Sequence, residues 1–177
     1  TGAHGRVEML PTLREWRELA RRNVQQCCIA FMDLDHLKEI NDRHGHVVGD
    51  QVLAGVVRQV MEHLRPYDRV FRYGGDEFLI SLPGADLAIG QKVIGHIREQ
   101  IAGTPIVASP AGHPIATTAS FGLALLEPDI SVEDSIDRAD KALLVAKAAG
   151  RNRVCSWDPA VTTSTLLRRM MEDDAVG

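Results

Sequence analysis

Hydrophobic positions change their spacing several times along the chain, and each change predicts a new element. Leu10 to Val24 has apolar residues on one side and Arg and Glu on the other, as in an amphipathic helix. Cys27 to Leu34 is a continuous apolar run between polar residues, which predicts a strand buried on both faces. Gly49 to Leu64 returns to helical spacing, so we expect a helix that packs on the sheet.

A pair of glycines separates two β-prone runs near the middle of the chain. Val70 to Tyr73 precede Gly74-Gly75, and Phe78 to Leu82 follow after Asp76-Glu77. Glycine tolerates the positive φ that tight hairpin turns need. The pattern therefore predicts a β-hairpin with two acids just past its tip.

The remaining pattern predicts two helices, two strands and a tail. These are a helix over Asp86 to Ile101, a strand over Ile115 to Leu126, a helix from Ser131 to Gly150 with Asp134 in a capping-box variant, and a closing strand over Asn152 to Trp157. The resulting order of helices and strands favours an α/β sandwich with an antiparallel central hairpin. We place one domain at residues 1–157 and a frayed tail at residues 158–177.

Composition narrows the class of protein. The chain has 177 residues, of which 45% are hydrophobic and 25% charged, as in a globular protein of one domain. The formal net charge is −4, so no overall basic field favours DNA or RNA as a partner. Three cysteines without a Cys-x-x-Cys pair argue against a disulfide framework or a zinc ribbon. No apolar stretch approaches the length of a membrane span, so we expect no membrane contact by this segment.

Acidic residues are the first candidates for chemistry. Asp33 ends a buried strand and Asp76 follows the hairpin tip, so their carboxylates can meet at one edge of the sheet. Mg²⁺ prefers such hard oxygen ligands and leaves positions open for water and phosphates, and Lys38 follows close behind. Alternatively, Asp76 and Glu77 are ordinary turn residues, since Asp is favoured in turns. Neither a P-loop nor a strand-linked Gly-x-Gly-x-x-Gly is present to cradle phosphates.

Several motifs, taken together, resemble one family. Arg72 to Phe78, which reads Arg-Tyr-Gly-Gly-Asp-Glu-Phe, is similar to the signature of the GGDEF domain family, the bacterial diguanylate cyclases. Asp33 to Asp42 resembles the first strand and following helix of that family, and Gly45-His46 with Gly49-Asp50 continues the likeness. Ala139 to Asn152 resembles its closing helix and strand. The resemblance runs from about Thr1 to Val154.

The resemblance implies a fold and a reaction. The expected fold is a palm-like βααββαβ core, with a central, mostly antiparallel sheet flanked by helices as in nucleotidyl cyclases. The implied reaction condenses two GTP into cyclic di-GMP with release of two pyrophosphates. Each domain holds one GTP, so a homodimer is needed for catalysis.

The resemblance also assigns roles to the acids and to Lys38. Asp33, the backbone carbonyl of Leu34 and Asp76 would bind Mg²⁺ or Mn²⁺, two ions per active site. Glu77 completes the acidic site, and one of the two motif acids acts as the base. Lys38 would face the phosphates. Without the family resemblance, it would be interpreted as a solvated lysine on a helix.

Nucleotide contacts follow in the same way. Asn41 and Asp50 would select guanine, with His46 near the ligand, and their amide and carboxylate match the guanine edge. Both residues are also well placed to cap helices. Lys147 and Arg151 resemble the triphosphate contacts of the family, and the helix dipole would equally favour them there. His44 and His46 lack a third ligand at a familiar spacing for zinc.

A second site and two other functions complete the expectations. Arg65 and Asp68 resemble the inhibitory Arg-x-x-Asp site that binds cyclic di-GMP, with His96 and Arg98 as alternatives for a further contact. Instead of a cyclase, the chain could be a non-catalytic receptor for cyclic di-GMP, or a cyclase for another nucleotide pair. The altered opening segment suggests a fragment of a longer signalling protein, located in the cytoplasm or anchored to a membrane by another part of that protein.

Overall fold

A five-stranded sheet forms the centre of the computed structural model, which describes residues 2–22, 25–107 and 114–165. Strand β1 (Cys27–Leu34) lies in the middle and pairs antiparallel with β3 (Glu77–Pro83) and β6 (Ala119–Leu125). Strand β2 (Arg69–Gly74) forms one edge beside β3, and β7 (Val154–Ser156) forms the other edge, parallel to β6. The order is β2-β3-β1-β6-β7.

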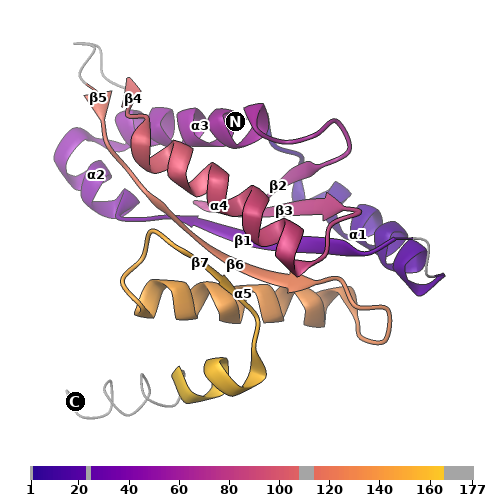
Figure 1. The fold of residues 1–177 in the computed structure, drawn as a ribbon. Helices are drawn as coiled ribbons and strands as arrows, with labels where there is room; N and C mark the ends of the chain where they lie inside the picture. The colour runs from indigo at the N-terminus through magenta and orange to yellow at the C-terminus, as the bar shows by residue number, and fades with distance from the viewer. Residues whose placement is uncertain (1, 23–24, 108–113, 166–177) are drawn as a thin grey trace.

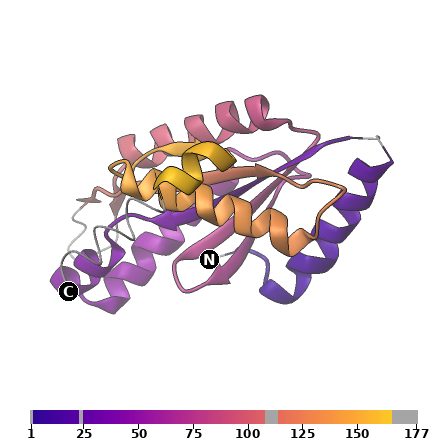
Figure 2. The same cartoon turned by 90° about the horizontal axis from the view of Figure 1, so that it is seen from below.

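Helices cover both faces of this sheet. Helices α3 (His46–Glu62) and α4 (Leu87–Gly103) lie on one face, and α5 (Val132–Ala148) lies on the other (Figure 1). The N-terminal helix α1 (Arg6–Arg21) contacts α5 and β2 on that second face (Figure 2). Short helix α2 (Leu37–His44) follows β1 directly and packs against α3.

The alternation of side chains along β1 explains the two layers. Cys28, Ala30 and Met32 belong to the apolar cluster formed with α3 and α4. Ile29 and Phe31, which point to the opposite face, belong to the cluster formed with α1 and α5. By the same alternation, Asp33 continues the row that faces α1 and α5.

The predicted fold class is confirmed, with local differences. Strand β1 has the predicted bounds, and the hairpin lies at Gly74-Gly75. The predicted strand at 115–126 is interrupted, because Ile115 pairs in a small hairpin of β4 (Ile106–Val107) and β5 (Pro114–Ile115). Helix α2 has no buried residue, so hydrophobic spacing did not indicate it and only the family resemblance did.

The ends of α5 follow the predicted local chemistry, whereas Asn41 lies inside α2 and Asp50 inside α3, so neither of them caps a helix. The side chain of Ser131 accepts a hydrogen bond from the backbone N–H of Asp134 at 2.9 Å and caps α5. Gly150 follows the end of that helix with φ at +111°, which glycine adopts easily. Residues 159–165 of the expected tail are helical, and residues 166–177 lie outside the described residues. All three cysteines are free, and none of the described helices is long and apolar enough to cross a membrane.

Candidate active site

The end of β1 and the start of β3 bring the predicted acids together. Asp33 stands directly opposite Glu77 in the antiparallel register, and Asp76 precedes Glu77 at the hairpin turn. Opposed residues of antiparallel strands have Cβ atoms about 5 Å apart and project from the same face. Asp140 of α5 adds a fourth carboxylate, since it lines a hollow of about 220 Å³ together with Glu77.

Crowding and burial change the acidity of this cluster. Burial raises the pKa of Asp33, and the charges of Asp76 and Asp35 add to this, while Lys147 opposes it. Burial likewise raises the pKa of Glu77, with further contributions from Asp33, Asp140 and Asp76. The pKa of Asp140 is also raised, mainly by burial. Burial and mutual repulsion therefore destabilise the ionised carboxylates, so the site favours binding of a cation.

Lys147 supplies a positive charge to the cluster. Its Nζ donates to Asp33 Oδ2 at 2.8 Å, with only 26% of the lysine side chain and 14% of the aspartate side chain exposed. Lys147 lies in the last turn of α5, which packs on β6 and β1. The two residues are 114 positions apart in sequence, so their contact depends on this packing.

Backbone geometry at the hairpin tip holds Asp76 in place. Gly75 has φ at +41°, in the left-handed region that glycine tolerates. The Arg72 guanidinium donates to the Gly75 carbonyl through Nε at 3.0 Å and Nη2 at 2.8 Å. Sequence reasoning gave Arg72 no role, although it belongs to the hairpin motif.

Asp35 is a site residue that sequence reasoning missed. Its carboxylate, in a residue that is only 3% exposed, accepts hydrogen bonds from the Thr118 and Ser120 hydroxyls, both at 2.7 Å, and from the Asn152 backbone N–H at 3.0 Å. Its own N–H donates to the Thr118 carbonyl at 2.9 Å. Asp35 thus connects the end of β1 to β6 and to the loop that carries Arg151. The spacing of Asp33 and Asp35, two residues apart at a strand end, was the available signal.

The predicted guanine contacts lie where α2 meets α3. Gly45 joins the two helices with φ at +86°, and the Asn41 side chain lies so close to Gly49 that a Cβ there would collide with Asn41 Oδ1. Asp50 follows Gly49 on an exposed part of α3, and His46 is exposed at the start of that helix. The structure therefore places Asn41 against Gly49, the residue that precedes Asp50.

These nucleotide candidates are separate from the acid cluster in the hydrogen-bond network. Among the described residues, no side-chain hydrogen bond or ion pair joins Lys38, Asn41, His46 or Asp50 to the acids. Lys38 is exposed in the first turn of α2. Arg151 is exposed in the loop after α5, with φ at +62°.

The donor set fits a magnesium ion that arrives with phosphates. Within residues 2–22, 25–107 and 114–165, no three His, Cys, Asp or Glu side chains are gathered to hold a metal by themselves. Asp33 and Asp76 offer hard oxygens, and the Leu34 carbonyl is next to Asp33 in the chain. Mg²⁺ is commonly bound through one or two carboxylates plus substrate phosphates and water. The available groups match that mode of binding.

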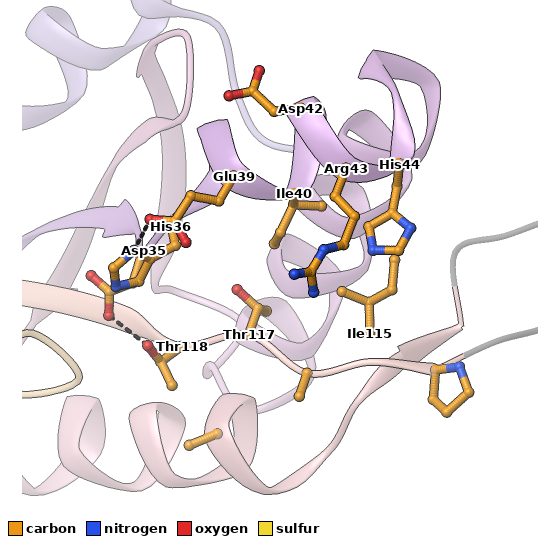
Figure 3. Close-up of a pocket in the computed structure, with 13 residues that line it drawn as sticks. Asp35, His36, Glu39, Ile40, Asp42, Arg43, His44, Ile115, Thr117 and Thr118 are labelled. Atoms are coloured by element: carbon orange, nitrogen blue, oxygen red, sulfur yellow. Dashed lines mark hydrogen bonds and ion pairs between the residues drawn. The ribbon is translucent and has the colours of Figure 1, made fainter.

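A large cavity lies beside α2 and is lined by neighbours of the candidates on that helix. It has a volume of about 1140 Å³ and lies between α2 and the segment around Thr117, with Ile40, Arg43 and Ile115 among its walls (Figure 3). None of the predicted site residues lines it, and Asp35 contributes to one end. The acid cluster lies elsewhere, with Asp33, Asp76 and Glu77 each half-buried.

The predicted inhibitory residues form a compact turn after α3. Asp68 Oδ2 accepts from the Arg65 backbone N–H at 2.8 Å, and the Asp68 N–H donates to the Arg65 carbonyl at 3.0 Å. Burial raises the pKa of Asp68, and the Arg65 N–H and charge oppose this. The His96 ring lies 5.2 Å from that of His63 at the end of α3, whereas Arg98 donates to Asn152 Oδ1. Of the two candidates for an additional contact, His96 is therefore the one beside the turn.

Comparison with known proteins identifies similar sequences. The family model described as "Diguanylate cyclase, GGDEF domain" matches residues 1–153. The chain is 36% identical to the diguanylate cyclase DgcP of Pseudomonas aeruginosa over 156 residues, which cover 87% of this chain and 23% of that protein. It is 39% identical to the diguanylate cyclase DosC of Escherichia coli K12 over 150 residues, covering 84% and 32%. The chain thus spans about a quarter to a third of these relatives.

Solved structures show the same fold. The GGDEF domain of DgcB from Caulobacter crescentus, in complex with c-di-GMP, superposes with a TM-score of 0.84 at 30% identity, covering 89% of this chain and 90% of that chain. The diguanylate cyclase SiaD of Pseudomonas aeruginosa, in complex with its activator SiaC, gives a TM-score of 0.82 at 33% identity, covering 88% and 59%. Helices and sheet therefore follow an arrangement already seen in this group of structures.

Proposed function

Because the chain belongs to the GGDEF domain family of diguanylate cyclases, we propose that it condenses two molecules of GTP into cyclic di-GMP and two pyrophosphates. The observation that carries this proposal is the acid cluster of Asp33, Asp76 and Glu77 beside Lys147. A protein that only binds cyclic di-GMP would not need this cluster. Its retention supports catalysis over a receptor role.

The reaction makes two phosphodiester bonds. In each step, a ribose 3′-oxygen attacks the α-phosphorus of the other GTP, a new P–O bond forms, and the bond from the α-phosphorus to pyrophosphate breaks. The proton of the 3′-hydroxyl passes to a base. Pyrophosphate leaves with the electron pair of the broken bond, so each step is balanced without a further reactant.

We assign metal binding to Asp33, the Leu34 carbonyl and Asp76, with two Mg²⁺ or Mn²⁺ ions in each site. When bound, such ions neutralise the triphosphate and lower the pKa of the attacking hydroxyl. The three donors supply hard oxygens at the end of one strand and at the adjacent turn. Arg72, through the Gly75 carbonyl, keeps that turn and Asp76 in position.

Glu77 is our candidate for the proton acceptor. Burial and the neighbouring carboxylates raise its pKa, and a carboxylate with a raised pKa binds a proton more readily. Lys38 lies on α2, Lys147 in the last turn of α5 and Arg151 in the loop after α5. We assign them to the triphosphate, where they would stabilise the charge that develops during transfer.

We assign guanine recognition to Asn41 and Asp50; the contact of Asn41 with Gly49, which precedes Asp50, supports this assignment. The carboxylate can accept from the guanine N1–H and exocyclic amino group, and the amide can donate to its oxygen. Adenine would leave these polar groups without partners, so GTP should be preferred to ATP. His46 lies in the same region and completes the proposed subsite.

Catalysis in this proposal needs two chains, each holding one GTP. The second copy would approach the acid cluster with its own nucleotide. Product would bind at the turn of Arg65 and Asp68 and inhibit further turnover, because a guanidinium can pair with a phosphate or a guanine edge. The preformed hydrogen bonds of this turn support the assignment.

Chromatography of reaction mixtures tests the proposal directly. Purified protein, stripped of nucleotide, is incubated with GTP and Mg²⁺ at low and high protein concentration. We expect cyclic di-GMP, with a rate that rises faster than linearly with protein. Asp76→Ala should abolish the product, whereas Asp129→Ala, in an exposed turn, should not. Parent-like turnover by Asp76→Ala would contradict the assigned site.

Inhibition is tested on the same samples. Arg65→Ala should keep turnover constant as product accumulates, and Arg58→Ala, an exposed arginine on α3, should slow as the parent does. A chain that binds cyclic di-GMP but makes none at any concentration would instead favour the receptor function.

A further inference from the structure

We propose that Lys147 occupies the place of a metal ion in the nucleotide-free site, so that a metal ion and GTP must bind together. This inference rests on the proposed function and adds a binding order to it. It assigns Lys147 two successive partners, Asp33 before the nucleotide binds and the triphosphate afterwards. Lys147 thereby prevents the site from filling with metal alone.

The contact between Lys147 and Asp33 is short and sheltered. The Nζ to Oδ2 distance of 2.8 Å is that of a charge-assisted hydrogen bond, and the aspartate side chain is 14% exposed. A cation that approached the Asp33 carboxylate would lie next to the lysine ammonium, which already holds Oδ2. Two positive charges at one carboxylate repel strongly where water is partly excluded.

Lys147 serves more than one carboxylate. Glu77, which stands directly opposite Asp33 in the register of β1 and β3, lies within reach of the same positive charge. Without any cation, these acids would crowd together at one edge of the sheet. The lysine therefore stabilises this group of acids, and losing its charge without a replacement cation would be costly.

Metal alone is a poor replacement. The described side chains provide no group of three or more ligands for an ion. An incoming ion would have to displace the lysine and would gain only two carboxylates and a carbonyl. Since Mg²⁺ gives up its water reluctantly, this exchange is unfavourable without phosphate oxygens.

A triphosphate changes this balance in two ways. It supplies the missing oxygens for the ion, and it offers Lys147 a new anionic partner. Lys147 is in the last turn of α5, with Arg151 nearby in the following loop, so the long lysine side chain can turn toward the phosphates. Binding of the metal and of the nucleotide is then coupled, and the coupling is reciprocal.

The test is a titration of the nucleotide-free chain with Mn²⁺, followed by electron paramagnetic resonance. We expect Lys147→Met to bind Mn²⁺ about tenfold more tightly than the parent, since the competing charge is gone. In contrast, 3′-deoxy-GTP, which cannot react, should bind Lys147→Met less tightly than the parent at saturating Mg²⁺, as measured by calorimetry. Tighter binding of Mn²⁺ together with weaker binding of the nucleotide would show that Lys147 exchanges Asp33 for the triphosphate.

A matched variant controls for overall charge. Lys92→Met removes a lysine from an exposed position on α4, on the other face of the sheet, and should keep Mn²⁺ affinity within about twofold of the parent. Lys147→Gln, which is also uncharged, should repeat the result of Lys147→Met. Thermal unfolding confirms that each variant is folded.

The outcomes separate this inference from the proposed function. Suppose that Asp33→Asn weakens Mn²⁺ binding in the presence of 3′-deoxy-GTP, but that Lys147→Met does not strengthen Mn²⁺ binding in the absence of nucleotide. The proposed exchange of Lys147 partners is then wrong, whereas the proposed metal site is supported. If Asp33→Asn leaves metal binding unchanged, both the metal site and the exchange are wrong. Tighter binding of Mn²⁺ alone by both Lys147 variants, but not by Lys92→Met, supports the inference.

Discussion

Asp33 and Asp35 lie two residues apart at the end of β1, yet their surroundings differ completely. Asp35 is buried, and among the described residues its donors are all neutral: the hydroxyls of Thr118 and Ser120 and the N–H of Asn152. Asp33 is bound by a charged lysine and faces other carboxylates. The fold itself supplies the hydrogen-bond donors of Asp35, whereas Asp33 is held by Lys147, which can exchange this partner for another.

The difference shows how one strand end can serve both structure and chemistry. Neutral donors fixed in the backbone or in short side chains satisfy Asp35 permanently, so it can connect β1, β6 and the loop after α5. A flexible lysine satisfies Asp33 only until another cation takes its place. Burial raises the pKa of Asp33 despite this lysine, so the lysine only partly offsets the burial and crowding of this carboxylate.

Removing Asp33 tests the functional half of the comparison and should have the largest effect. Asp33→Ala should lower turnover of GTP by about a thousandfold or more, because a metal ligand is lost. The free energy of unfolding should change by no more than about 1 kcal/mol, since repulsion among the acids is relieved as the ion pair is lost. Activity assays and urea denaturation measure both quantities. Turnover close to that of the parent would show that Asp33 has no catalytic role.

Removing Asp35 tests the structural half. Asp35→Ala should lower the free energy of unfolding by about 2–4 kcal/mol, because it leaves two hydroxyls and one N–H without an acceptor in a buried place. Asp35→Asn keeps one acceptor oxygen and should cost less. Urea denaturation of the three proteins gives the order. A variant Asp35→Ala as stable as the parent would contradict the connecting role.

Removing a single hydrogen-bond donor to Asp35 should lower the stability by less than removing Asp35 itself. Ser120→Ala removes one of its hydrogen bonds and should cost about 1 kcal/mol of stability. Ser81 is a matched control, since its hydroxyl is equally buried on β3 but has no hydrogen-bond partner among the described residues. Ser81→Ala should therefore be neutral or stabilising, again by urea denaturation. Equal losses in both variants would show that the bond to Asp35 contributes nothing.

The smallest effect concerns the pH dependence of the acid cluster. The pKa of Glu77 in the folded protein lies above its ordinary value of 4.5, so the folded state binds this proton more tightly than the unfolded chain does. The ionised group therefore destabilises the fold as pH rises through the raised pKa, and the penalty disappears as pH falls below the ordinary value. Glu77→Gln should raise Tm by about 1–3 °C at neutral pH and by nothing near pH 4.

Calorimetry across this pH range measures the effect. Glu15→Gln, on an exposed part of α1, is the matched control and should follow the parent at every pH. A difference between Glu77→Gln and the parent that grows toward acid pH would have the wrong sign and would contradict the crowding of the carboxylates.

Local patterns in the sequence were enough to predict much of the architecture and the family. The apolar run of β1, the glycine pair of the hairpin and the Ser131 cap are determined by residues close together in the chain, and all three are confirmed. The convergence of Asp33 with the hairpin acids also followed, because a strand end and a turn tip can be located from spacing alone. The roles of these acids stay a prediction.

Only the tertiary structure determined which groups satisfy those acids. Lys147 reaches Asp33 across 114 residues because α5 packs on β1 and β6, and hydrophobic spacing says nothing of where a polar side chain at the end of such a helix will lie. In the same way, Asp35 meets donors from β6 and from the loop after α5 only once the sheet is assembled. Sequence determined the elements because their signals are local, whereas the choice between a structural and a functional aspartate depended on contacts between distant parts of the chain.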